Sequence, residues 1–224
     1  MKIRVRFSKQ GMMKFIGHLD MVRYFQKVHR RADLDVVYSE GFSPHQKMSF
    51  ASPLSVGLLS RGEYYDLEVA SSMSSKEMIQ RMNEQNVEGV EVLSFKLLPD
   101  GAKNCMSIVA AADYLVHGNF NAEKVQDFLS QKEIQVLKKT KKSEKIVDIR
   151  PMIYEMNTTD EGLYMKVAQG SAANLKPDLV IRSLFDFMNE EVPGNIVYER
   201  LDMYCLEGEQ LISLDAVGEE IIKH

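Results

Sequence analysis

Side chains able to move protons or bind metals are concentrated in the first third of the chain. They are His18, Asp20, His45, Glu63 and Asp66. Imidazole and carboxylate groups serve as general acids, general bases and metal ligands. His18 and Asp20 are two positions apart at the start of an expected helix, where their side chains do not share a face. We take His18, Asp20 and His45 as candidate catalytic residues, the alternative for the first two being a surface histidine and a helix-capping charge.

No recognised catalytic or nucleotide-binding motif accompanies these residues. The sequence contains no P-loop, dinucleotide fingerprint, nucleophile elbow or HExxH motif. Two cysteines and five scattered histidines form no zinc-ligand pattern, and a three-cysteine iron–sulfur motif is absent. We therefore expect no metal and no cofactor. Cys105 and Cys205 suit a reducing compartment, so we expect a cytoplasmic protein.

The stretch from Tyr38 to Asp66 combines the composition of a loop with the apolar content of a core element. It is rich in Ser, Gly and Pro, yet large apolar residues recur at near-alternate positions. A disordered linker would not carry that much apolar surface. We expect an irregular β-hairpin that holds its polar residues on a rigid scaffold, and we expect its EGFSPH turn to lie near the helix that starts at His18. Glu63 and Asp66 are expected to be charges at strand ends or partners of Arg61.

Charge is unevenly distributed along the chain. The net charge is −4, but residues 1–31 carry nine basic residues and one acidic residue, a net charge of +8. Residues 1–105 have a net charge of +3 and residues 106–224 a net charge of −7. A local basic surface attracts polyanions even on an acidic protein. The residues expected to bind RNA or another anion are Arg4, Arg6, Lys14, Arg23, Lys27, Arg30, Arg31 and Lys47.

Four of these cations recur at helical spacing. Arg23, Lys27, Arg30 and Arg31 lie at i, i+4, i+7 and i+8, so they share one face of a helix. Such a face is either a solvated surface or a ridge that contacts an anion. A run of lysines within residues 138–142 has the same two interpretations at the tip of an expected hairpin.

Composition indicates a globular chain without a membrane span. Hydrophobic residues make up 45% and charged residues 27%. No apolar run approaches the roughly 20 residues needed to cross a bilayer, and the N-terminus has no apolar signal-peptide core. We therefore expect no contact with a membrane.

Periodicity in the first half predicts a βαββαβ order. Residues 2–7 alternate like a strand, and residues 18–32 place an apolar stripe that includes Leu19, Val22 and Phe25 at helical spacing. Residues 36–38 and 63–70 read as strands, with a turn at residues 60–62. Ser74 and Glu77 form a capping box that starts a second helix, and residues 90–98 read as a closing strand.

The second half repeats this order with an extra strand. Strands are expected at residues 112–117, 134–137, 145–149, 152–156, 163–168 and 196–206. Asn121 caps one helix and Pro177 opens the other. The sequence therefore predicts an α+β protein of two tandem ferredoxin-like (βαββαβ) domains, residues 1–105 and 106–224. The acidic tail, residues 207–224, is expected to form a short strand or an arm against a partner.

Three short motifs resemble those of the radical SAM-linked protein family, a bacterial domain of unknown function. FIGHLD, EGFSPH and EYYD occur in the order and spacing of that family, and the stretches VDIRPMI and NLKPDLVI also match. The resemblance implies an accessory or substrate-presenting partner of a radical SAM protein. The chain lacks the radical SAM three-cysteine loop. The polar and charged motif residues expected on a functional surface are Glu40, Ser43, His45, Glu63, Asp66, Asp148 and Arg150.

Three hypotheses of function follow. The leading one is a non-catalytic accessory module that binds RNA, or presents a substrate, for a radical SAM enzyme modifying RNA or a ribosome-associated target. The alternative is a metal-dependent or acid–base hydrolase of the RNA-processing type, centred on His45 with His18 and Asp20. Tandem ferredoxin-like domains resemble the RNA-binding RAMP superfamily in topology, but the glycine-rich loop of its nucleases is not evident. The third hypothesis is a protein-interaction scaffold without RNA, whose acidic C-terminal half docks a basic partner.

Overall fold

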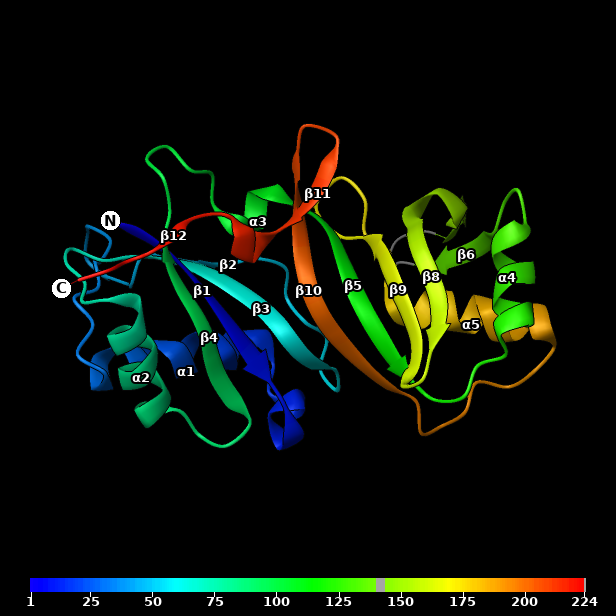
Figure 1. Ribbon diagram of the computed structural model, residues 1–224, viewed down its shortest axis with the longest axis horizontal. Helices are drawn as coiled ribbons and strands as arrows, with labels where there is room; N and C mark the ends of the chain where they lie inside the picture. Colours follow the sequence, from blue (N-terminus) through cyan, green and yellow to red (C-terminus); the bar gives the residue numbers. More distant parts are fainter. Residues whose placement is uncertain (140–143, 224) are drawn as a thin grey trace.

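One mixed β-sheet runs through the whole molecule and joins its two halves (Figure 1). In this computed structural model, residues 1–139 and 144–223 are described. Within them the main sheet has the strand order β12-β4-β1-β3-β10-β5-β9-β8, with β2 added to β3 and β11 to β10. Strands β6 and β7 form a separate two-stranded sheet.

The elements of the first half follow in this order along the chain. They are β1 (Lys2–Lys9), the 3-10 helix η1 (Gly11–Phe15), α1 (His18–Arg31), β2 (Met48–Phe50), β3 (Leu59–Glu68), α2 (Ser75–Gln85), β4 (Val90–Leu97) and α3 (Cys105–Ile108).

The second half begins with β5 and ends in a short C-terminal strand. Its elements are β5 (Val109–His117), α4 (Ala122–Ser130), β6 (Gln135–Lys139), β7 (Glu144–Asp148), η2 (Arg150–Met152), β8 (Ile153–Thr159), β9 (Gly162–Ala168), α5 (Pro177–Met188), β10 (Val197–Glu207), β11 (Gln210–Ser213), η3 (Leu214–Ala216) and β12 (Glu219–Glu220).

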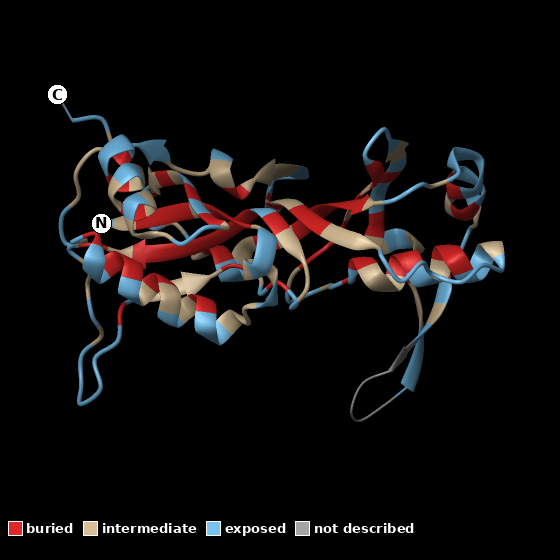
Figure 2. Cartoon of the chain, turned by 90° about the horizontal axis from the view of Figure 1, so that it is seen from below, coloured by how far each residue is buried: buried red, intermediate tan, exposed pale blue. Residues whose placement is uncertain are grey.

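Helices cover the sheet over two hydrophobic cores. In the first half, alternate residues of β1, among them Ile3 and Val5, pack with Phe25 of α1 and Met82 of α2. In the second half, α4 and α5 pack on β5, β8 and β9. Figure 2 shows the buried residues running through the sheet and along the inner faces of the helices. Alternate residues of a strand point to opposite faces of the sheet, so the apolar residues of each half lie on one face. The helices cover this face.

The two halves meet where β3 and β10 pair in parallel. Leu59 is paired with Glu199 and Ser60 with Arg200. The contact continues at Gly62, where a Cβ atom would lie 2.4 Å from the carbonyl oxygen of Leu201. The sequence prediction of a turn at residues 60–62 is therefore wrong, because these residues lie inside β3. A glycine within a strand marks a close approach of another backbone.

The C-terminal tail returns to the first half. Strand β12 pairs with β4, and the Ser94 hydroxyl donates a hydrogen bond to Asp215 of η3. The backbone N–H of Ile221 donates to the Ser75 hydroxyl at 2.8 Å. A segment assigned from the sequence to the second domain thus packs on the first.

The structure confirms the α+β class and several predicted element boundaries. Ser74 forms the predicted capping box with Glu77, the Asn121 side chain accepts from the backbone of Lys124, and Pro177 opens α5. No described helix is long and apolar enough to cross a membrane.

Other details of the predicted pattern need correction. Residues 36–38 form isolated bridges and no strand. The buried face of α1 contains Met21 and His29, whereas Leu19 is 69% exposed. His29 replaces an apolar residue in that stripe because it forms two buried hydrogen bonds, to Gln46 and Tyr65. The lysine run extends into residues 140–143, which lie outside the described residues.

Candidate functional site

A small cavity brings together three ionisable side chains from separate elements. Lys9 comes from the end of β1, His18 from the start of α1 and Glu63 from β3. The cavity has a volume of about 20 Å³, enough for one water molecule. Its other lining residues are apolar or proline: Phe7, Met21, Phe50, Pro53 and Leu54. Two motif residues that are 45 positions apart in the sequence, His18 and Glu63, therefore meet at one site.

The Glu63 carboxylate is almost completely buried and is incompletely satisfied. The residue is only 5% exposed, and its Oε1 atom has no hydrogen-bond partner. Arg200 Nη1 lies 3.4 Å from Oε1, close enough for an ion pair. Burial raises the pKa of Glu63, whereas Arg200, Ser60 and Lys9 oppose that rise. A buried acceptor without a donor costs free energy. Glu63 Oε1 is such an unsatisfied acceptor in the cavity.

Lys9 provides a buried cation beside this carboxylate. Its Nζ donates to the carbonyl oxygen of Ile16 at 2.7 Å and to that of Lys14 at 3.4 Å. Burial lowers the pKa of Lys9, the negative charge of Glu63 opposes this, and Arg200 adds to the lowering. The two carbonyl oxygens belong to the segment between β1 and α1, and they hold the ammonium group beside it.

His18 completes the polar lining of the cavity. Its ring packs edge-on against Phe50, with ring centroids 5.3 Å apart, and burial lowers its pKa below the ordinary value. The cavity thus offers a hydrogen-bond donor on Lys9, an acceptor on Glu63 and an imidazole that is neutral at neutral pH. Such a set can hold one small polar group. Among the described residues, no group of three or more His, Cys, Asp or Glu side chains could hold a metal ion.

The other two candidate catalytic residues lie elsewhere. Asp20 is exposed and forms an ion pair with Arg23 at 3.3 Å. His45 is exposed in the loop after α1, and its Nδ1 is 2.8 Å from the Ser39 hydroxyl. Among the described residues, no hydrogen bond or ion pair joins His18 to either of them. The structure instead places His18 in the same small cavity as Lys9 and Glu63.

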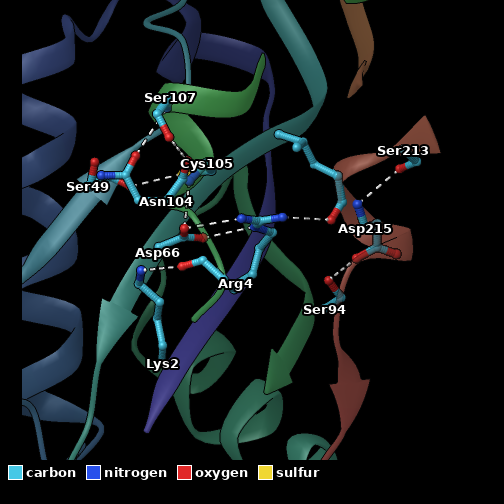
Figure 3. Close-up of polar contacts among 12 residues, drawn as sticks. Lys2, Arg4, Ser49, Asp66, Ser94, Asn104, Cys105, Ser107, Ser213 and Asp215 are labelled. Carbon is cyan, nitrogen blue, oxygen red and sulfur yellow. Dashed lines mark hydrogen bonds and ion pairs between the residues drawn. The ribbon is translucent and has the colours of Figure 1, made fainter. Parts of the chain in front are cut away.

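The remaining motif residues divide into loop residues and structural residues. Glu40 and Ser43 are exposed in the same loop as His45. Asp66 is buried and accepts from Arg4, and Figure 3 shows this pair between β1 and β3. The EGFSPH loop lies next to the second half of α1, away from its start at His18, because the Gln46 side chain donates to the carbonyl oxygen of Gln26.

Asp148 and Arg150 stabilise the turn that follows β7. The Asp148 side chain accepts from the backbone N–H groups of Ile134 and Arg150. The Arg150 guanidinium donates to the carbonyl oxygens of Leu129 and Ile153. Both residues therefore connect α4, β6 and β8, and their contacts explain the motif in structural terms.

The basic residues of α1 form a ridge on its exposed face. Arg23, Lys27, Arg30 and Arg31 are all exposed, on the side away from buried Phe25. Arg23 is paired with Asp20, whereas Lys27, Arg30 and Arg31 have no ion pair within the part of the chain that the structure describes. We call these four residues the α1 ridge.

The other expected anion-binding residues are not part of this ridge. Arg4 is 1% exposed and paired with Asp66, so the expectation that it contacts RNA needs correction. Arg6 is partly buried and donates to the carbonyl oxygen of Leu201. Lys47 forms an ion pair with Glu68 at 3.4 Å. Lys14 is partly exposed, and its Nζ lies 5.2 Å from the centre of the Phe15 ring.

Sequence reasoning missed two buried cations of the site. Lys9 lies just beyond the strand expected at residues 2–7, and Arg200 lies in a strand 137 positions after Glu63. Arg200 donates to the carbonyl oxygens of Ser52 and Pro53, which fixes the loop that lines the cavity. No local signal distinguishes either residue from a surface cation.

Comparison with known proteins identifies several similar solved structures and a family. The solved structure "Crystal Structure of a Cbf5-Nop10-Gar1 Complex" is similar at 12% sequence identity and a TM-score of 0.46. The similarity covers 95% of this chain and 52% of that chain, so this chain spans about half its length. No curated protein matches. A family model described as "Uncharacterized protein conserved in bacteria (DUF2344)" matches residues 2–177. The chain belongs to this bacterial family.

Proposed function

We propose that this protein is a non-catalytic module that binds RNA along the α1 ridge and presents it to a radical SAM enzyme. The target is an RNA or a ribosome-associated substrate. The observation that carries the proposal is the α1 ridge itself. Like charges at i, i+4 on a helix repel one another, and three of the four cations have no ion pair among the described residues. A phosphate backbone would supply the missing negative charges.

The partner enzyme is inferred from the sequence motifs. FIGHLD, EGFSPH and EYYD resemble the radical SAM-linked family, and that resemblance is the support for this part of the proposal. Tagging the chain in its host and identifying the proteins that purify with it tests the link. A radical SAM protein retained after nuclease treatment, without RNA, would instead favour a protein-interaction scaffold.

A repeated scaffold is part of the same proposal. We infer that each half is a ferredoxin-like domain. The support is the strand order, which is β4-β1-β3-β2 in the first half and β10-β5-β9-β8 in the second. Taken in chain order, the first of the four strands is connected to the second by a helix in each half, and the third to the fourth by another helix. The β6–β7 hairpin is an insertion in the second half.

Salt dependence provides the direct test of RNA binding. If four phosphates contact the ridge, the logarithm of the affinity should fall with the logarithm of salt with a slope of about −2.8 for a single strand. That slope corresponds to about a 50-fold loss of affinity between 50 and 200 mM salt. Fluorescence anisotropy with labelled tRNA or rRNA fragments measures it.

A charge-matched pair of variants separates the ridge from net charge. Lys27→Gln, Arg30→Gln and Arg31→Gln together should reduce the slope by about three quarters, because one of four contacts remains. The control carries Lys76→Gln, Lys124→Gln and Lys132→Gln, three exposed lysines elsewhere. Equal affinities for the two triple variants would contradict the proposal.

A further inference from the structure

The most exposed aromatic side chain among the described residues is in a loop that is attached to α1. Phe42 is fully exposed, at 109% of its reference area. Burying a phenylalanine side chain stabilises a protein by about 1.5–3 kcal/mol, and Phe42 contributes nothing of this kind. No aromatic contact involves it within the described residues. Its exposure therefore has no explanation in the packing of the chain.

The loop that carries Phe42 is closed and attached to α1. At its base, the Ser39 N–H donates to the carbonyl oxygen of His45 at 2.8 Å, and the side chains of the same two residues are in hydrogen-bond contact. Gln46 then contacts His29 and the carbonyl oxygen of Gln26, both on α1. Figure 2 shows a long exposed loop projecting from this end of the molecule. The hydrogen bonds attach the base of the loop that carries Phe42 to the second half of α1.

A second exposed apolar group lies at the other end of α1. Met12, Phe15 and Leu19 are 78%, 53% and 69% exposed. They belong to η1 and to the first turn of α1. The ridge thus has Phe15 before its first turn and the Phe42 loop attached to its second half. Helix α1 has 14 residues, which gives it a length of about 21 Å, and that length matches about six stacked nucleotides at 3.4 Å per nucleotide.

We propose that the α1 ridge and Phe42 form a binding site for single-stranded RNA, in which an unpaired base stacks on Phe42. The inference rests on the proposed function and specifies the form of RNA that is bound. Exposed aromatic rings beside a line of cations are the features that single-stranded nucleic acids use. A duplex offers phosphates but no free base. Glu40, two positions from Phe42 in the same loop, disfavours a phosphate at the tip and leaves the base as its contact.

The absence of tryptophan from the chain allows a direct test of stacking. In the variant Phe42→Trp the introduced residue is the only tryptophan in the chain, so its indole is the only source of tryptophan fluorescence. A ten-nucleotide single-stranded RNA should quench its fluorescence, whereas a long-chain polyphosphate should bind the ridge without quenching. The matched control is Phe187→Trp, on α5 in the other half, whose fluorescence should not respond to RNA. Phe42→Ala should weaken binding of the single strand about 10-fold and leave polyphosphate binding unchanged.

The outcomes separate this inference from the proposed function. RNA binding that depends on the ridge, with no quenching of the indole and no effect of Phe42→Ala, overturns the stacking site and leaves the RNA-binding proposal intact. Absence of RNA binding in every variant overturns both. Quenching by a co-purified protein alone, without RNA, assigns Phe42 to a protein interface and also overturns the inference.

Discussion

Arg4 and Asp66 form a buried ion pair with two parallel contacts between neighbouring strands. Arg4 Nε lies 2.9 Å from Asp66 Oδ1, and Arg4 Nη2 lies 3.2 Å from Oδ2. Asp66 also accepts from the backbone N–H of Cys105 at 2.7 Å, and Arg4 donates to the carbonyl oxygen of Leu214 at 3.4 Å. The pair therefore connects β1 and β3 to α3 and to the C-terminal η3 (Figure 3).

Removal of Asp66 is the first test of this arrangement. Asp66→Ala leaves the Arg4 guanidinium buried without a counter-charge, and we expect the free energy of unfolding to fall by about 3–5 kcal/mol. Urea denaturation followed by circular dichroism measures the change. The control is Glu68→Ala, which breaks the half-exposed pair with Lys47 and should cost less than about 1 kcal/mol. Similar losses for the two variants would contradict a special role for the buried pair.

Removing the carboxyl group of Glu63, unlike that of Asp66, is expected to increase stability as the pH rises. Burial raises the pKa of its carboxyl group, so the folded protein binds this proton more tightly than the unfolded chain does. Its contribution to stability is present below the ordinary pKa of 4.5 and is lost as the pH rises through the folded value. Glu63→Gln should therefore gain stability relative to the wild type as the pH is raised from 4.5 to 7.5. Urea midpoints at several pH values test this, and a relative loss would show that attraction to Arg200 and Lys9 outweighs burial.

His29 should control stability at mildly acidic pH. Burial lowers its pKa from 6.5 to about 4, so its neutral form is favoured in the folded protein. The stabilisation is complete above pH 6.5 and is lost as the pH falls towards 4, in total about 3 kcal/mol. His29→Gln cannot become charged and should show a smaller loss of stability over this range. An unchanged difference in unfolding free energy between pH 7 and pH 4 would contradict this assignment.

The sequence predicted local features well because local residues determine them. The capping box at Ser74, the cap at Asn121 and the proline that opens α5 depend on residues within one helical turn. The alternation of β1 likewise places Ile3 and Val5 on the covered face. These features need no knowledge of distant parts of the chain.

Burial of the polar face of β1 could not be predicted in this way. Alternation indicates that Arg4 faces solvent, yet the carbonyl oxygen of Leu214, 210 positions away, lies against its guanidinium group. Lys9 lies on the opposite, helix-covered face of β1, where the η1–α1 connection places two carbonyl oxygens around its ammonium group. The sequence favours His45 over Glu63 as a catalytic candidate because the composition of its loop is a local feature, whereas the cavity at Glu63 depends on the meeting of β1, α1 and β3.

Gly62 provides the sharpest test of the junction between the halves. A Cβ atom at this position would lie 2.4 Å from the carbonyl oxygen of Leu201 and 2.6 Å from Cα of Asp202. Backbone atoms cannot move aside as the end of a flexible side chain can, so Gly62→Ala should push β10 away from β3. We expect a loss of about 1–3 kcal/mol in the free energy of unfolding. Gly194, where an added Cβ would meet no atom within 4 Å, gives the matched control Gly194→Ala. Equal stabilities for the two variants would show that the β3–β10 contact adjusts freely.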